Sequence, residues 1–303
     1  MSRQAILGID IGASKVKLAL VFKNGKMTGG NSFPVPEGAK PEQLAAMIGE
    51  RAAALTARNR VRITAAGAGV PGHIANDRRS LIYAPNLRWK NIAFTDLLES
   101  ELCVPVVLEN DVNAAAFGEH RYGAAKDTGH VICVFVGTGV GGGVIVDGKL
   151  LRGTTGNSAE VGHTIFRPGG RTCSCGRSGC VEAYAGGVHI PEHYAQLGGK
   201  RGLKAADVWE LAARGNRRAA RVVSDATAAL VTLLVNLQTV FDAGRIVLGG
   251  GVIEHLPGLY QKVKEGVKSH LCGHWKSRVR IVRSRLGANA GVLGAAALAR
   301  ELI

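Results

Sequence analysis

The 303-residue sequence lacks any apolar run that approaches the roughly 18 uncharged residues of a membrane-spanning helix. Its first residues, Met-Ser-Arg-Gln, lack the architecture of a secretory signal. We therefore expect a soluble, cytoplasmic protein with no membrane partner. Proline is scarce, at 9 residues, while 46% of residues are hydrophobic, which excludes collagen, coiled coils and disorder. At about 150 residues per domain, the length predicts two domains.

Acidic residues are also in deficit. The chain has 23 Asp and Glu against 38 Lys and Arg, which gives a net charge of +15. This balance favours anionic ligands such as nucleotides, polyphosphate or nucleic acid, without choosing among them. A basic stripe at helical spacing has no interleaved aromatic residues, so we expect a solvated helix face and no nucleic-acid partner. The stripe consists of Arg214, Arg217, Arg218 and Arg221.

Glycine is abundant, with 42 residues, and two segments repeat a pattern of strand, glycine turn, strand and hairpin turn. The first segment covers residues 5–25 and ends at Asn24-Gly25. The second covers residues 131–148 and ends at Asp147-Gly148. Such pairs are typical of type I′ hairpin turns. Two copies about half a chain apart predict an α/β protein with two structurally related halves.

No low-complexity linker separates these halves. We place the domain boundary near residue 115, at the start of a predicted helix. Residues 1–114 together with the last helix, residues 289–303, are then expected to form a small lobe. Residues 115–288 are expected to form a large lobe, and the last helix to pack back on the first half of the chain.

The segment Gly137–Gly142 fits the pattern G-x-G-x-x-G, but a dinucleotide-binding fold needs a helix directly after it. The strand Val144–Val146 follows instead. A P-loop is also excluded, because Leu150 stands where Ser or Thr must reach Mg²⁺. What remains is a turn between paired strands, whose N–H groups and Thr138 hydroxyl can bind phosphate. An ordinary hairpin is the alternative; the repeated glycine turn and the triplet Gly249–Gly251 favour a nucleotide cleft.

Asp10 begins the first glycine turn, where it precedes Gly12, Ser14 and Lys15. A carboxylate beside a phosphate-sized turn can hold Mg²⁺, directly or through water. A solvated turn aspartate is the alternative interpretation. Lys15 is a candidate contact of the nucleotide, although it can equally be a surface lysine.

Asp111 follows the buried strand Val104–Leu108, where α/β proteins place groups that face a ligand crevice. A carboxylate there can accept the proton of a sugar hydroxyl that attacks a γ-phosphate. The alternative is that Asp111 caps a helix beginning near Ala114. Asn113 is better placed for that cap, so we favour catalysis.

His163, Cys173, Cys175 and Cys180 form the pattern H-x9-C-x-C-x4-C. Four soft ligands at this spacing predict a tetrahedral zinc site, and a closed set of four indicates a structural site. Free thiols in a surface loop are the alternative, but crowded thiols invite oxidation.

Together these motifs resemble the ROK family of sugar kinases, within the hexokinase, Hsp70 and actin superfamily, and the resemblance covers essentially the whole chain. It implies a two-lobed, actin-like (ribonuclease H-like) ATPase fold with an interlobe cleft and a small zinc-binding loop. The motifs that carry it are Asp10–Lys15, Glu109–Ala114, Gly137–Gly143, Glu160–His163, Cys173–Cys180 and Leu248–Val252.

The resemblance assigns roles to individual residues. Asp111 matches the catalytic base, and His163 ligates zinc while facing the sugar. The residues around the sugar hydroxyls match Gly72, Asn110, Asp111, Glu160, His163 and Glu182, and Asn86 lies in a segment, Ala84–Asn91, that resembles ROK glucokinases. The ATP contacts match Gly12, Ser14, Thr138, Gly139, Gly250 and Gly251, and their neighbours Asp10, Ala13, Lys15, Gly137 and Gly249 complete the expected nucleotide site. Gly12-Ala13-Ser14 departs from the family's usual Gly-Gly-Thr.

The function that the resemblance implies is ATP- and Mg²⁺-dependent phosphorylation of a hexose, most simply glucose, at its 6-hydroxyl. N-acetylglucosamine, N-acetylmannosamine, fructose and allose are alternative substrates, and polyphosphate is an alternative donor. A sugar-responsive regulator is the alternative outside enzymes, which the lack of an N-terminal helix-turn-helix disfavours. The family suggests a homodimer or homotetramer.

Overall fold

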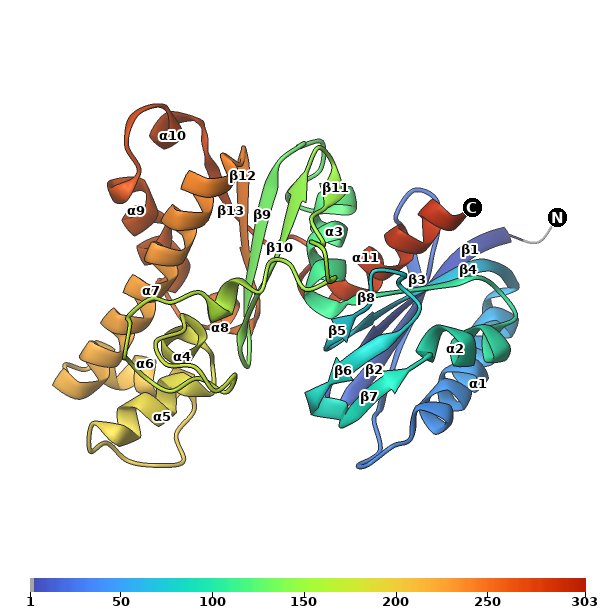
Figure 1. The fold of residues 1–303 in the computed structure, drawn as a ribbon, viewed down its shortest axis with the longest axis horizontal. Helices are drawn as coiled ribbons and strands as arrows, with labels where there is room; N and C mark the ends of the chain where they lie inside the picture. The colour runs from blue at the N-terminus through green and yellow to red at the C-terminus, as the bar shows by residue number, and fades with distance from the viewer. Residues whose placement is uncertain (1–2) are drawn as a thin grey trace. The chain divides into compact units, whose positions relative to one another are not determined.

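The computed structural model describes residues 3–303 (Figure 1). The chain forms two compact units. The first comprises the chain up to Asp127 together with Lys149–Ser158 and Ala288–Ile303, and the second comprises Thr128–Gly148 and Ala159–Gly287. The predicted boundary near residue 115 falls inside the helix α3 (Asp111–Tyr122), which packs against the C-terminal helix of the first unit. The division into lobes at residue 115 stays a prediction.

The first unit is built on a five-stranded sheet in the order β3-β2-β1-β4-β8. β1 pairs antiparallel with β2 and parallel with β4, and β4 pairs parallel with β8. The strands are β1 (Arg3–Ile11), β2 (Lys15–Val21), β3 (Met27–Pro34), β4 (Val61–Val70) and β8 (Val106–Asn110). A small antiparallel sheet contains β5 (His73–Ile74), β6 (Leu81–Ala84) and β7 (Trp89–Ile92). The helices are α1 (Pro41–Asn59), α2 (Phe94–Leu102), α3, α11 (Ala290–Ala299) and the 3-10 turns Pro85–Leu87 and Arg300–Leu302.

The second unit repeats this arrangement. Its sheet has the strand order β11-β10-β9-β12-β13, in which β10 is antiparallel to β9, and β12 is parallel to both β9 and β13. The strands are β9 (Val131–Val136), β10 (Val140–Val146), β12 (Arg245–Gly249) and β13 (Arg280–Arg283), and β11 (Lys149–Leu150) follows β10 in the chain. The helices are α4 (Glu182–Ala185), α5 (His189–Gln196), α6 (Ala205–Ala213), α7 (Arg217–Phe241), α8 (Gly251–His255), α9 (Leu259–His270) and α10 (Gly273–Arg278), with 3-10 turns at Val161–His163 and Gly287–Asn289.

The expected pair of related halves is confirmed, because both sheets begin with an antiparallel pair and continue with parallel strands. The hairpin turns differ from the prediction at one of two places. Asp147 and Gly148 both have positive φ, as a type I′ turn requires. At Asn24-Gly25 only Gly25 has positive φ, so the type I′ assignment is wrong there.

The longest helix, α7, corrects the expectation that nothing in the chain is apolar enough to span a membrane. Within residues 3–303 it is the one helix that meets that test by length and composition. Its apolar residues have another explanation: α7 packs against α4, α6 and α9 in the core of the second unit. Leu230, Leu233 and Leu234 on this helix are at most 1% exposed.

The C-terminal helix α11 packs against the sheet of the first unit, as predicted. All ten of its residues are buried. It contacts β1 and β4 where both strands carry glycine, because a side chain there would enter the helix backbone. A Cβ atom on Gly8 would lie 2.2 Å from the carbonyl oxygen of Val292, and one on Gly67 would lie 1.9 Å from that of Ala295.

We expect Gly67→Ala to lower the free energy of unfolding by roughly 3 kcal/mol, because the added methyl group overpacks the contact between β4 and α11. Urea unfolding followed by circular dichroism measures the change. Gly129→Ala is the matched control, since a Cβ atom there meets nothing within 4 Å. Equal stability of both variants would contradict this account of the packing.

Candidate active site

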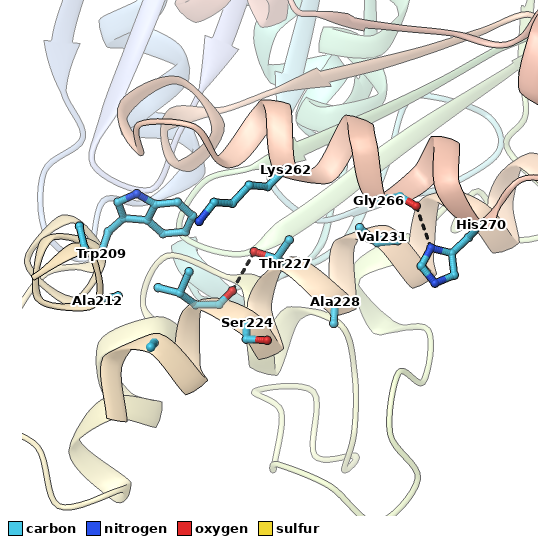
Figure 2. Close-up of a pocket in the computed structure, with 12 residues that line it drawn as sticks. Trp209, Ala212, Ser224, Thr227, Ala228, Val231, Lys262, Gly266 and His270 are labelled. Carbon is cyan, nitrogen blue, oxygen red and sulfur yellow. Dashed lines mark hydrogen bonds between the residues drawn. The ribbon is translucent and has the colours of Figure 1, made fainter. Parts of the chain in front are cut away.

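One well-formed pocket of the second unit lies between α6, α7 and α9, with a volume of about 480 Å³ (Figure 2). Two of its polar groups have partners: the Thr227 hydroxyl donates to the carbonyl of Val223 over 2.8 Å, and the Lys262 ammonium lies 5.4 Å from the Trp209 ring centre. No carboxylate or thiol lines it. The chemistry-bearing residues lie instead at the ends of strands.

Asp111 is the first residue of α3, directly after β8. The helix begins three residues earlier than expected, and its cap is Asn110, whose side-chain oxygen accepts from the backbone N–H groups of Val112 over 2.9 Å and Asn113 over 3.1 Å. The prediction that Asn113 forms the cap is therefore wrong. The reason is that Asn110 keeps an extended ψ at the strand end and reaches both N–H groups. The Val112 N–H also donates to Asp111 Oδ1 over 3.0 Å, so Asp111 supports the cap that Asn110 provides.

Asn110 also contacts Gly72, another residue predicted to bind the sugar, at the end of β8. The Asn110 side-chain nitrogen donates to the carbonyl of Gly72 over 3.2 Å. Gly72 must be glycine here, because a Cβ atom would lie 2.4 Å from the carbonyl oxygen of Tyr83. Gly72, Asn110 and Asp111 therefore share one strand end of the first unit. Asn86 is exposed in the 3-10 turn between β6 and β7.

The first glycine turn closes tightly, because the Gly12 N–H donates to the carbonyl of Lys15 over 2.8 Å. Asp10 precedes it, and a Cβ atom on Gly291 would lie 2.7 Å from the Asp10 carboxyl carbon, so this carboxylate rests against the first turn of α11. Burial raises the pKa of Asp10, and the charges of Lys17 and Lys15 oppose that rise. A partly desolvated carboxylate beside a glycine turn suits a hydrated cation such as Mg²⁺.

The remaining residues of this turn are exposed. Ala13, Ser14 and Lys15 face solvent.

The second glycine turn joins β9 to β10 and is held by the carboxylate of Glu182, the first residue of α4. Glu182 Oε2 accepts from the Val140 N–H over 3.0 Å, and a Cβ atom on Gly139 would lie 2.2 Å from the same oxygen. The Gly137 N–H donates to the carbonyl of Gly139 over 2.9 Å, and Thr138 at the tip is exposed. Glu182 was expected at the sugar, and that contact stays a prediction; in the structure its carboxylate contacts the second glycine turn.

The triplet Gly249–Gly251 follows β12 beside a pocket of about 290 Å³. Gly250 has a φ of 89°, and a Cβ atom on it would lie 2.5 Å from the carbonyl oxygen of Val136. Sequence reasoning missed the other residues at this pocket. Beyond Leu248, which the motif Leu248–Val252 includes, they are Ile253, Glu254, Arg283, Ser284, Arg285 and Gly287. No motif marks them, because β13 is brought here by its parallel pairing with β12.

The four predicted zinc ligands come together in the second unit. Their ligand atoms all lie within 4.8 Å of one another. The sulfur atoms of Cys175 and Cys180 are 3.7 Å apart, and His163 Nδ1 lies 3.6 Å from the Cys173 sulfur. Zinc at about 2.3 Å from each sulfur in a tetrahedron needs sulfur atoms roughly 3.8 Å apart. The donor set and spacing therefore fit structural zinc.

The loop also carries two carboxylates that the sequence associated with the sugar. Glu160 is exposed and directly precedes the short helical turn Val161–His163. Glu182 Oε1 accepts from the Ser174 hydroxyl over 3.0 Å, and the Cys173 sulfur lies 3.7 Å from that oxygen. A metal that ordered the cysteines would therefore also restrain the turn between β9 and β10, because Glu182 contacts both.

The predicted site residues divide between the two units. The first holds Asp10, Gly12, Ala13, Ser14, Lys15, Gly72, Asn86, Asn110 and Asp111. The second holds Gly137, Thr138, Gly139, Glu160, His163, Cys173, Cys175, Cys180, Glu182, Gly249, Gly250 and Gly251. Their contacts with sugar and nucleotide stay predictions.

Comparison with known proteins adds independent findings. The family model described as "ROK family" matches residues 6–302. A glucokinase of Streptomyces coelicolor is 32% identical over 312 residues, covering 97% of each chain. An N-acetylmannosamine kinase of Yersinia pestis is 32% identical over 295 residues, covering 97% of this chain and 98% of the relative. The solved structure of a ROK family glucokinase from Streptomyces griseus, in complex with glucose and AMPPNP, has a TM-score of 0.81 and 31% identity, covering 98% of this chain and 99% of that one.

We expect metal analysis of the purified protein to find one zinc per chain. Cys180→Ala should lower both the zinc content and the melting temperature, because a structural zinc contributes directly to folding. Cys272→Ala is the control, since Cys272 is exposed and lies outside the cluster. Full zinc content and unchanged melting in Cys180→Ala would contradict the assignment.

Proposed function

The chain belongs to the ROK family, and from that premise we propose that it transfers the γ-phosphoryl group of ATP to the 6-hydroxyl of a hexose, with glucose as the preferred substrate. The fold class expected from the sequence, an actin-like ATPase, is confirmed by the likeness to solved ROK kinase structures. The chain is an ATP-dependent hexose kinase of the glucokinase type.

The observation that carries the proposal is the position of Asp111. It stands at a strand end beside Gly72 and Asn110, and the helix it begins is capped by Asn110. Its carboxylate can accept the proton of the sugar 6-hydroxyl as that oxygen attacks the γ-phosphorus. The bond from phosphorus to the ADP oxygen breaks, and the products are hexose 6-phosphate and ADP, with the proton left on Asp111.

The nucleotide side is proposed to use the two glycine turns and the triplet Gly249–Gly251. Backbone N–H groups without side-chain obstruction can bind phosphate oxygens, and Thr138 adds a hydroxyl. Mg²⁺ held at Asp10, when bound, would neutralise charge on the phosphates. Zinc in the loop of His163 would act structurally, since four protein ligands leave no position for substrate.

Glucose is favoured because relatives named glucokinase match over nearly the whole chain. N-acetylmannosamine is the second candidate, since a relative so named is equally identical. The two sugars differ at carbon 2, where a hydroxyl in glucose is replaced by a bulky acetamido group. A site built to hydrogen-bond a hydroxyl can reject an analogue that lacks it by large factors.

The setting proposed for the enzyme follows from its substrates. We propose a cytoplasmic location, because ATP, the proposed phosphoryl donor, is available there. Polyphosphate is kept as an alternative donor because the chain carries a net charge of +15. A homodimer or homotetramer is the expected assembly.

We expect Asp111→Asn to lower kcat by roughly 10²–10⁴-fold, because an amide cannot accept the proton, while the melting temperature stays close to that of the parent. Coupled ADP release measures the rate. A kcat within tenfold of the parent would exclude Asp111 as the base.

A panel of sugars and donors tests the substrate assignment. With ATP and Mg²⁺, kcat/KM is expected to be highest for glucose and at least tenfold lower for N-acetylmannosamine, N-acetylglucosamine, fructose and allose. Phosphorus NMR of the product identifies the 6-phosphate. A higher kcat/KM for another hexose would contradict glucose as the preferred substrate. A higher kcat/KM with polyphosphate would contradict ATP as the preferred donor.

A further inference from the structure

Glu109 and Arg152 form an ion pair next to the proposed base, and neither has a role in the mechanism above. Arg152 Nε donates to Glu109 Oε2 over 2.8 Å, and Glu109 is 3% exposed. Arg78 Nε lies 3.8 Å from the same oxygen, so two guanidinium groups face one carboxylate. A carboxylate buried this deeply requires such compensation.

The other oxygen of Glu109 contacts residues on both sides of Asp111. Oε1 accepts from the backbone N–H of Asn110 over 3.1 Å and from the side-chain nitrogen of Asn113 over 3.3 Å. Asn110 in turn caps α3. The direction in which the first turn of α3 presents Asp111 therefore depends on the Glu109 carboxylate.

Arg152 belongs to a segment, Lys149–Ser158, that is fastened to the same part of the first unit. His73 Nε2 lies 2.6 Å from the carbonyl oxygen of Thr155, and the Asn76 side chain donates to the carbonyl of Thr154. Two residues beyond Ser158 the chain reaches Glu160, a proposed sugar contact. One buried carboxylate thus connects the turn that carries the base with the start of the segment that carries Glu160.

We propose that Glu109 and Arg152 are positioning residues for phosphoryl transfer, which hold Asp111 in the orientation that accepts the sugar proton. This inference rests on the proposed function of Asp111. A displacement of about 1 Å in a reacting group can cost roughly 10²-fold in rate, so loss of the pair is expressed mainly in kcat.

A purely structural pair would affect stability and rate together, and a set of three variants separates the two cases. Glu109→Gln leaves Arg78 and Arg152 without their carboxylate partner, and Arg152→Gln leaves the buried Glu109 carboxylate with Arg78 alone. Each change is expected to destabilise the fold. The double variant keeps the summed charge of Arg78, Glu109 and Arg152 at its parental value of +1, since one charge of each sign is removed. Its stability is therefore expected to recover, whereas the orientation of Asp111 is not restored.

The experiment measures kcat, KM for glucose and ATP, and melting temperature of the full-length chain. Each single variant is expected to lower kcat about 10–100-fold, with KM for ATP within threefold of the parent, and to lower the melting temperature. The double variant is expected to regain most of the melting temperature while its kcat stays low. Recovery of kcat together with stability in the double variant, or parental kcat in Arg152→Gln, would overturn the proposal.

Arg79→Gln is the matched control, because Arg79 is adjacent to Arg78 but pairs on the surface with Glu99 over 2.7 Å. It should leave kcat unchanged. In an Asp111→Asn background, Arg152→Gln is expected to cause no further loss of kcat; an additional tenfold loss would show that Arg152 does not act through Asp111.

The same variants separate the two proposals. Parental kcat in Asp111→Asn would overturn the function proposed for Asp111 and the positioning inference with it. An inactive Asp111→Asn beside a fully active Arg152→Gln would overturn the positioning inference alone.

Discussion

The start of helix α3 is the constraint on which the proposed chemistry depends. The Asn110 side-chain oxygen accepts hydrogen bonds from the first N–H groups of the helix, and its side-chain nitrogen donates to the carbonyl of Gly72. Asn110 provides the cap, and Asp111 Oδ1 shares the Val112 N–H over 3.0 Å, so the Asp111 carboxylate is held at the start of the helix. The buried Glu109 carboxylate fixes the backbone just before it. The position of Asp111, the proposed base, therefore depends on the cap formed by Asn110 and on the buried carboxylate of Glu109, both at the end of β8.

In the second unit, the glycine turn after β9 and the cysteine-containing loop both contact Glu182. The turn after β9 has glycine where a side chain would collide with Glu182, and Glu182 also contacts the loop that carries the cysteines. A metal that orders this loop would therefore also order the phosphate turn, through a single carboxylate. If the turn binds nucleotide as proposed, zinc binding would then affect nucleotide binding through Glu182.

Much of this arrangement is local in sequence and could be predicted from it. The glycine turns, the Cys and His spacing, and the acid after a buried strand are short-range patterns, and the repeat of strand, turn and strand indicated two related halves. The start of α3 was misplaced because Asn110 and Asn113 are both good caps, and only the backbone at the end of β8 decides between them. Arg152, Arg283 and Ser284 escaped prediction because they reach their sites through pairing and loop docking, across distances that no local pattern records.

The central claim is that the Asp111 carboxylate accepts the proton from the sugar 6-hydroxyl. A crystal structure of the protein with glucose and a non-hydrolysable ATP analogue tests it most directly. The account predicts an Asp111 carboxylate oxygen within about 3.2 Å of the sugar O6, with that O6 facing the γ-phosphate. A sugar bound with O6 beyond hydrogen-bond reach of Asp111, in a complex that also holds the nucleotide, would contradict it.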